Sequence, residues 1–228
     1  KGELAREQLM PKNFVFYNPD HHQKIISLVE SKGIKALIFI VGKSGFYEGG
    51  EYPFPIIEDG DFLIPSVFIS EESGEKLLTN LSDRIKVISR TKKTPSKGYN
   101  VIGRKGNSEA RKISVTAHLD AKKGSSGAID NATGVVTILL ISELLKNYRG
   151  GFQIEMIAFN GEDYYSVPGQ MTYIRNKKDD FSDIALNINI DGAGLNKGNT
   201  SYSLMDLPGK DSETTRSVFN KYPGLEEG

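Results

Sequence analysis

The pattern of apolar and polar residues changes near residues 90–98. That segment is polar and basic and contains both Pro and Gly, which is typical of a linker. Before it, short apolar runs predict strands at residues 14–17, 36–41 and 64–70, and helical spacing predicts helices at 20–31 and 71–81. A long loop rich in Gly, Pro and aromatic residues, at 42–60, separates the second of these strands from the third. The pattern therefore predicts two domains, residues 1–92 and residues 93–228.

In the second domain, strands and helices alternate. The apolar runs predict strands at residues 100–103, 113–117, 154–159 and 184–190, and helices at 131–147 and 169–175. The helix at 131–147 is apolar on most sides, so we expect it to lie inside the fold rather than on its surface. Strands that alternate with helices favour an α/β fold whose sheet contains parallel segments.

The composition narrows the class of protein only a little. A chain of 228 residues has room for one or two domains with a real core. Lys+Arg and Asp+Glu balance at 29 each, so the net charge does not favour a nucleic-acid partner or an anionic membrane. The chain has no cysteine, which excludes disulfides, thiolate ligands and a Cys nucleophile. Its apolar runs, such as residues 36–41, are far shorter than the ~20 residues of a membrane-spanning helix.

Acidic residues and one histidine follow three of the predicted strands. His118 and Asp120 come after the strand that ends at residue 117, Glu162 and Asp163 follow the strand at 154–159, and Asp191 follows residue 190. In α/β sheets the ligand site lies beyond the carboxyl ends of the strands, so these side chains should meet at one edge. Histidine with several carboxylates is the ligand chemistry of a hydrolytic zinc site, often one with two metals.

Each of these residues also has a structural interpretation. A histidine at a strand end, such as His118, can simply bond to a backbone group. Asp130 and Asn131 stand at the start of the long helix, where both residue types are favoured as caps, although a capping carboxylate can also face a metal. Glu162 and Asp163 could form a solvated acidic turn, or one could bind metal while the other acts as general base.

At these residues the chain resembles the zinc aminopeptidase family that includes bacterial leucyl aminopeptidases, aminopeptidase Y and glutamate carboxypeptidase II. The matching segments are residues 116–120, 127–135, 159–163 and 189–191. Residues 1 to about 90 resemble the protease-associated domain that many of these enzymes carry. The resemblance implies a mixed, mostly parallel sheet sandwiched by helices, preceded by a smaller α+β protease-associated domain.

The resemblance also implies a metal centre with two Zn²⁺ ions in the complete active site. Asp130 would bridge both ions, His118 and Asp191 would hold one of them, and Asp163 would help to hold the other. The family most often has Glu at position 163. It also supplies a second His ligand downstream, which the residues up to Gly228 do not contain, so we expect the chain to be truncated.

The implied activity is hydrolysis of N-terminal peptide bonds by a metal-activated water. Glu162 would be the general base, and Asp120 would orient His118. Peptides would be the substrates, and the resemblance implies a secreted or periplasmic location. Two alternatives stay open: a non-catalytic binding protein on the same scaffold, as in transferrin receptors, and a single-zinc acyltransferase like glutaminyl cyclase. The remaining histidines, His21 and His22, lie in the first domain and are predicted to face solvent.

Overall fold

The structure is a computed structural model of the chain. It describes residues 9–10, 12, 18–41, 62–80, 84–88, 90, 92, 94–122, 124–164, 166–178 and 180–228. The chain divides into two compact units, residues 1–97 with 164–167 and residues 98–163 with 168–228. The domain boundary at residues 92 and 93, and the protease-associated nature of the first domain, stay predictions. None of the described helices has the length and apolar character needed to cross a membrane.

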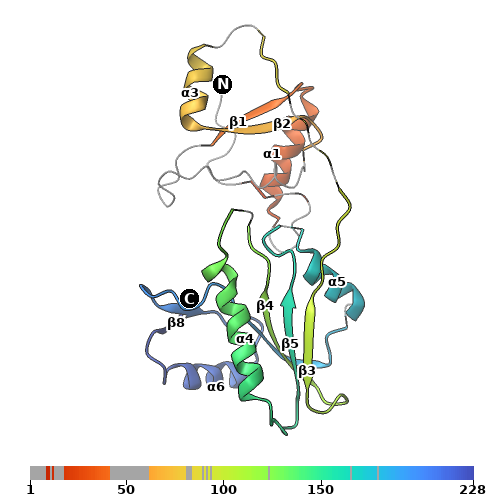
Figure 1. Ribbon diagram of the computed structural model, residues 1–228, viewed down its shortest axis with the longest axis vertical. Coiled ribbons are helices and arrows are strands. Elements are labelled where there is room, and N and C mark those ends of the chain that lie inside the picture. Colours follow the sequence, from red (N-terminus) through yellow and green to blue (C-terminus); the bar gives the residue numbers. More distant parts are fainter. Residues whose placement is uncertain are drawn as a thin grey trace. The chain divides into compact units, whose positions relative to one another are not determined.

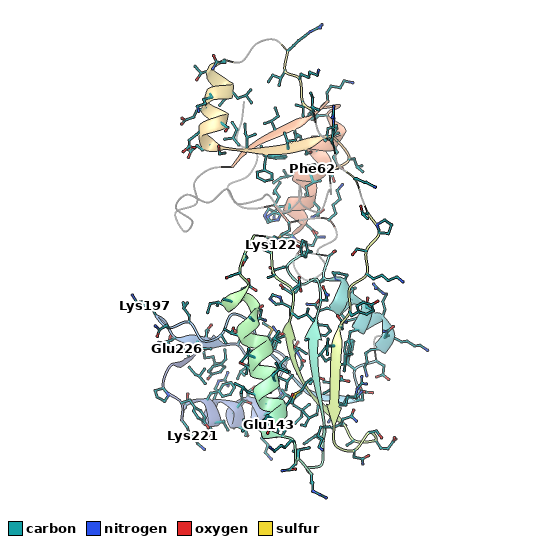
Figure 2. The ribbon with its side chains drawn as sticks, in the orientation of Figure 1. Phe62, Lys122, Glu143, Lys197, Lys221 and Glu226 are labelled. Atoms are coloured by element: carbon teal, nitrogen blue, oxygen red, sulfur yellow. The ribbon has the colours of Figure 1, made fainter. Side chains whose placement is uncertain are left out.

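The first unit is a small α/β layer. Its two parallel strands are β1 (Leu37–Val41) and β2 (Ser66–Ser70), and its helices are α1 (Asp20–Ser31) and α3 (Glu71–Thr79) (Figure 1). Ser70 caps α3 by accepting the backbone N–H of Ser73 at 3.3 Å. The core is formed by Leu9, Ile26, Val29 and Phe62, the last of which is labelled in Figure 2. The predicted strand at 14–17 and loop at 42–60 lie outside the described residues.

His22 corrects the prediction that both histidines of the first unit face solvent. His21 is exposed, but His22 is only 1% exposed, and its Nδ1 accepts the backbone N–H of Met10 at 3.0 Å. The reason is helical spacing, because His22 shares the buried face of α1 with Ile26 and Val29. The prediction is therefore wrong for His22, which belongs to the interior of the unit.

The second unit is built on one four-stranded sheet, whose strands β3, β5 and β4 lie side by side in Figure 1. Its strands are β3 (Val101–Lys105), β4 (Lys112–His118), β5 (Gln153–Phe159) and β6 (Ile184–Asn189). They lie in the order β3-β5-β4-β6, with β3 antiparallel to β5 and the other pairs parallel. This arrangement confirms the predicted α/β fold with a mixed, mostly parallel sheet.

Helices α4 (Thr133–Leu144) and α5 (Pro168–Lys177) cover opposite faces of this sheet. On one face, Ile154 and Met156 of β5 pack in the same core cluster as Ile138 of α4. On the other face, the Tyr173 hydroxyl of α5 donates to Glu155 Oε1 at 2.6 Å. Successive residues of a strand point to opposite faces, so the two helices sandwich the sheet as predicted.

Helix α4 is less buried than its sequence predicts. Four of its apolar side chains are largely exposed: Val136 at 52%, Leu139 at 63%, Leu140 at 60% and Leu144 at 82%. The expectation that this helix lies inside the fold is therefore wrong for this chain. The physical reason is that the sheet covers only one side of the helix, the side that carries Ile138.

Three further elements follow the sheet and were not predicted. They are β7 (Thr200–Tyr202), α6 (Gly209–Phe219) and β8 (Leu225–Glu227), with β7 and β8 paired in parallel. Each strand is only three residues long, too short for a periodic signal to develop. Helix α6 packs on this pair through an edge-to-face contact between Phe219 and Tyr202, whose ring centroids are 4.5 Å apart.

Candidate metal centre

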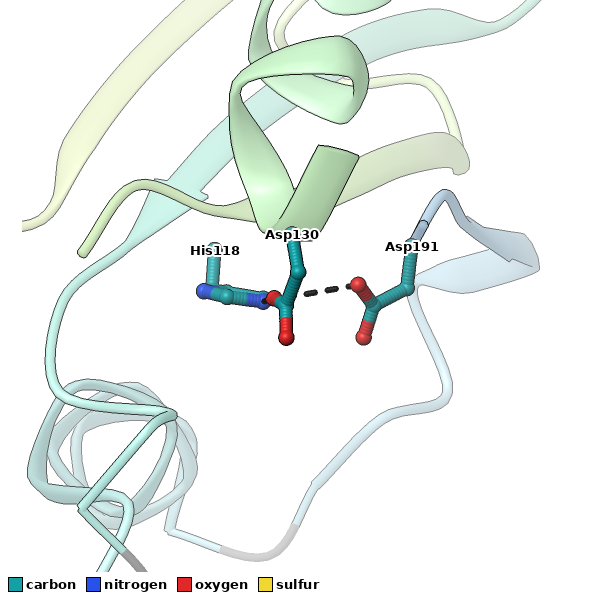
Figure 3. Close-up of side chains that lie close together, drawn as sticks. All are labelled: His118, Asp130 and Asp191. Atoms are coloured by element: carbon teal, nitrogen blue, oxygen red, sulfur yellow. Dashed lines mark ion pairs between the residues drawn. The ribbon is translucent and has the colours of Figure 1, made fainter. Parts of the chain in front are cut away.

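His118 lies at the carboxyl end of β4 and is the centre of the cluster. Its ring is 3% exposed, and its Nε2 lies 2.9 Å from Asp130 Oδ1, 3.4 Å from Asp191 Oδ1 and 3.6 Å from Glu162 Oε2. Figure 3 shows Asp130 and Asp191 beside the imidazole ring. The loops after three parallel strands thus bring their side chains to one edge of the sheet, as the sequence predicts.

The other ring nitrogen of His118 defines how the imidazole is oriented. Nδ1 lies 3.0 Å from the backbone carbonyl oxygen of Asp120, which can only accept a hydrogen bond. Nδ1 therefore carries a proton and donates it to this carbonyl, and the lone pair of the neutral ring is at Nε2. Among the described residues Nε2 has no hydrogen-bond partner. A buried nitrogen that faces only carboxylate oxygens is suited to share a cation with them.

Two overlapping groups of side chains have the spacing of metal ligands. The first is His118, Asp130 and Asp191, and the second is His118, Asp120 and Asp163. In each group the ligand atoms lie within 4.8 Å of one another. Every residue to which the sequence analysis gave a metal-binding role thus lies in this cluster. Imidazole nitrogen and carboxylate oxygen together form the donor set of hydrolytic zinc sites, so the residues fit the expected metal.

The carboxylate of Asp120 holds the turn that carries the other two acidic residues. Its Oδ1 accepts the backbone N–H groups of Gly161 at 2.7 Å and Glu162 at 3.1 Å, and its Oδ2 accepts that of Asp163 at 3.2 Å. The same carboxylate lies 3.8 Å from Nδ1 of His118, beyond hydrogen-bonding distance. Its direct bonds therefore go to the turn, while the carbonyl of Asp120 orients the imidazole.

The turn itself depends on Gly161, and a further hydrogen bond holds its far end. Gly161 has φ of +88°, and a Cβ there would lie 2.6 Å from Cγ of Pro168. A larger residue at this position would be strained both by its backbone conformation and by this contact. At the other end, the ammonium of Lys122, labelled in Figure 2, donates to the carbonyl of Asp163 at 2.6 Å.

Asn131 is a residue of the site that the sequence analysis did not assign to it. It follows Asp130 in the irregular turn η1 (Ala128–Ala132) that leads into α4, and it is 2% exposed. The cap interpretation is partly correct, because its Oδ1 accepts the N–H of Gly134 three residues on. Its amide also reaches the segment that carries Asp191. No pattern in a single sequence signals that second contact.

The excess of negative charge shifts the pKa values of the cluster. Burial of the His118 ring favours its neutral form, but the nearby carboxylates of Asp120, Glu162 and Asp191 outweigh burial and raise its pKa to about 9. Burial, with the charges of Asp191 and Asp163, raises the pKa of Glu162 above its ordinary value. All of these interactions favour a bound cation, which would neutralise the carboxylates and take the place of the proton on Nε2.

The fold and the cluster together define a class of protein: an α/β domain with a histidine–carboxylate metal centre at the carboxyl edge of its sheet. This is the arrangement used by metal-dependent hydrolases. The family follows from the sequence. The chain belongs to peptidase family M28, whose profile matches residues 100–224, more than half of its length.

Known relatives agree with this membership. The chain is 27% identical over 179 residues to Aminopeptidase YwaD of Bacillus subtilis (strain 168), a match that covers 76% of this chain and 38% of that protein. The fold is similar to that of BSAP, a zinc aminopeptidase from Bacillus subtilis, with a TM-score of 0.64 and 22% identity over 90% of this chain and 51% of the other. It is also similar to an aminopeptidase from Aneurinibacillus sp. strain AM-1, with a TM-score of 0.59 and 17% identity over 98% of this chain and 56% of the other.

These matches confirm the predicted zinc aminopeptidase family and its fold. The chain spans about two fifths of the length of the curated relative and about half the length of the two solved structures. The roles of the individual site residues are a separate question, and they stay predictions.

Proposed function

We propose that this protein is a zinc-dependent aminopeptidase that hydrolyses the peptide bond after the N-terminal residue of its substrate. The observation that carries the proposal is the buried Nε2 of His118, which faces carboxylates from three separate loops and has no hydrogen-bond partner among the described residues. Membership of family M28 supports a peptidase, and the similarity to Aminopeptidase YwaD and to the zinc aminopeptidase BSAP supports zinc as the metal and a substrate with a free N-terminus.

The proposed site holds two zinc ions. His118, Asp130 and Asp191, whose ligand atoms lie within 4.8 Å of one another, would bind the first. Asp163 would help to bind the second, with Asp130 as the shared ligand that the family resemblance implies. When bound, zinc lowers the pKa of a coordinated water toward ~7 and polarises the scissile carbonyl. The high pKa of His118 in the metal-free chain means that zinc binding at neutral pH displaces a proton from Nε2.

Glu162 is the proposed general base. Its side chain is 38% exposed, so a substrate and a water can reach it, and burial together with the charges of Asp191 and Asp163 raises its pKa. A raised pKa brings a carboxylate closer to the operating pH, where it can both accept and return a proton. Glu162 would take a proton from the attacking water and give it to the nitrogen of the leaving peptide as the C–N bond breaks.

Asp120 would act on the reaction through its neighbours. Its carbonyl sets the direction of the His118 ring, and its carboxylate fixes the backbone of the turn that carries Glu162 and Asp163. Reacting groups must be held in a narrow range of geometry, so a fixed turn preserves the distance from the base to the metal ligands. Burial favours the protonated form of Asp120, but the contact with His118 and the backbone N–H bonds outweigh it and lower its pKa.

The test is hydrolysis of an aminoacyl substrate with a free α-amino group, compared with the same substrate acetylated at that nitrogen. We expect cleavage only of the free amine, loss of activity with a chelator, and recovery when zinc is added. Cyclisation of an N-terminal glutaminyl peptide without aminoacyl cleavage would show the acyltransferase instead. Zinc uptake with neither reaction would show a binding protein.

We also propose a secreted or periplasmic location, which the resemblance to the zinc aminopeptidase family suggests. Fractionation of the native cells followed by immunodetection of the protein tests it. Recovery of the protein with the cytoplasmic fraction alone would refute this proposal and leave the proposed reaction unaffected.

A further inference from the structure

We propose that Asn131 is a positioning residue of the metal centre. Its buried amide joins the segment that carries Asp191 to the turn that carries Asp130, so that both carboxylates can bind one cation. This inference rests on the proposed zinc-dependent function and adds a residue to which neither family membership nor the relatives assign a role.

The contacts of Asn131 reach both sides of one proposed ligand. Its Nδ2 donates to the backbone carbonyl of Ile190 at 2.9 Å, and its Oδ1 lies 3.4 Å from the backbone N–H of Gly192, which donates to it. Ile190 and Gly192 are the neighbours of Asp191 in the chain, and Asn131 itself directly follows Asp130. One neutral side chain therefore connects the backbones next to both carboxylates.

The same connection continues to His118. The backbone N–H of Ile190 donates to the carbonyl of Thr116 at 2.8 Å, two residues before His118 on β4. The third proposed ligand is thus tied to the other two through Ile190. Figure 3 shows the result, with the carboxylates of Asp130 and Asp191 both beside the ring of His118.

The connection holds two like-charged side chains close together. Asp130 and Asp191 carry like charges, and both side chains are largely exposed, at 63% and 44%. Because their charges are alike, the two carboxylates repel each other when no cation lies between them. A ligand pair that is held in place before zinc arrives does not have to be ordered when zinc binds, so less binding free energy is lost.

The geometry also explains why the residue is an amide. The position needs a donor toward the Ile190 carbonyl and an acceptor toward the N–H of Gly134, and asparagine supplies both without charge. Gly134 permits the close approach, because a Cβ there would lie 2.4 Å from Oδ1 of Asn131 and 2.7 Å from the Ile190 carbonyl oxygen.

A helix cap alone would not require all of these bonds. The bond from Gly134 to Oδ1 stabilises the start of α4, as a cap does. The bond from Nδ2 to Ile190 belongs to no helix and connects residues 59 positions apart. The substitution Asn131→Asp separates the two roles, because it keeps an acceptor for Gly134 and replaces the donor with an oxygen that faces the Ile190 carbonyl.

The experiment measures the zinc affinity of the full-length protein by competition with a chromophoric chelator. It compares the wild type with Asn131→Asp, Asn131→Ala and Ile157→Val. The last variant is the control, because Ile157 is fully buried on the face of β5 opposite Ile154 and Met156, away from the cluster against which Ile190 packs, and removing one methylene there destabilises the unit. We expect zinc affinity to fall about 10–100-fold in both Asn131 variants, as is usual when a residue that holds metal ligands is lost, and to stay unchanged in Ile157→Val.

The outcomes are distinct. Unchanged or tighter zinc binding in Asn131→Asp, with lower stability of the metal-free chain, would reduce Asn131 to a structural cap and overturn the inference. If Asn131→Ala does not fold, the Asp variant, which has nearly the same volume, decides. A wild type that binds no zinc would overturn both this inference and the proposed function. A wild type that binds zinc but cleaves no aminoacyl substrate would overturn the function alone, and the ratio of zinc affinities would still decide the role of Asn131.

Discussion

The two sides of the metal centre are held by different chemical groups. On the side of β5, the carboxylate of Asp120 binds three successive backbone N–H groups of the turn that carries Glu162. On the side of β6, the amide of Asn131 binds one carbonyl and accepts an N–H next to Asp191. A carboxylate can only accept, whereas an amide also donates. The residue type on each side therefore follows from the backbone groups that the neighbouring loop presents.

The two groups also differ in their effect on the charge of the site. Asp120 contributes to the high pKa of His118, whereas Asn131 is neutral. Loss of Asp120 should therefore change both the position of Glu162 and the protonation of the imidazole. Loss of Asn131 should change only geometry.

The substitution Glu162→Gln should have the largest effect on activity. It removes the proposed base but keeps its backbone N–H and nearly its volume, so the bond to Asp120 and the zinc content should remain. We expect kcat to fall about 10²–10⁴-fold, the usual contribution of general base catalysis. Steady-state kinetics and elemental analysis measure both quantities. Glu143→Gln on the surface of α4, labelled in Figure 2, is the control and should behave as the wild type. Full activity in Glu162→Gln would exclude this residue as the base.

The substitution Asp120→Ala should have the next largest effect, because it leaves three N–H groups of the turn without their acceptor. We expect kcat to fall about 10–100-fold, the cost of losing a residue that holds reactive groups. Asp120→Asn should be less impaired, because its remaining oxygen can still accept from Gly161 and Glu162. Kinetics of the three proteins at saturating zinc test this order. Equal loss in Ala and Asn would show that the negative charge, rather than the hydrogen bonds, is what matters.

The pH dependence of zinc binding should separate the two sides of the site. In the metal-free chain the pKa of His118 rises from 6.5 to about 9, so zinc affinity should increase with pH until about 9. The corresponding stability of the metal-free chain is fully present below pH 6.5 and is lost as the pH rises through about 9. Zinc titrations across this range should show the rise move to lower pH in Asp120→Asn but not in Asn131→Ala. An equal profile in all three proteins would contradict the assigned charge effect.

The substitution Arg104→Ala should have the smallest effect on the metal centre. Arg104 pairs with Glu155 at 2.5 Å on the α5 face of the sheet, and Glu155 is fully buried. Without Arg104, the Glu155 carboxylate keeps its hydrogen bond from Tyr173. We expect the free energy of unfolding to fall by about 1–3 kcal/mol, because a buried charged group loses a partner, while zinc affinity stays the same. Denaturant unfolding and the chelator competition test this pair of outcomes. A weaker zinc site would show that the two faces of the sheet are coupled.

Much of the second unit could be predicted because its patterns are local. The apolar runs of β4, β5 and β6 and the helical spacing of α5 each lie within one short segment. Parallel strands place their carboxyl ends at one edge, so His118 and the acidic residues after β5 and β6 could be expected to meet there. The same argument could not show that one side of α4 is left exposed, because that depends on what packs against the helix.

The sequence by itself determined the order of strands and helices along the chain, the family, and which metal-binding residue types follow which strand. The tertiary structure alone decided that Asp120 holds the turn of Glu162, that Asn131 connects the loops of Asp130 and Asp191, and that His22 is buried. The physical reason is the distance along the sequence over which each interaction acts. Periodicity and turn chemistry act over a few residues, whereas the side chains of Asp120 and Asn131 bond to loops 41 to 61 residues away, and no local pattern records which backbone groups a folded chain brings within reach of a side chain.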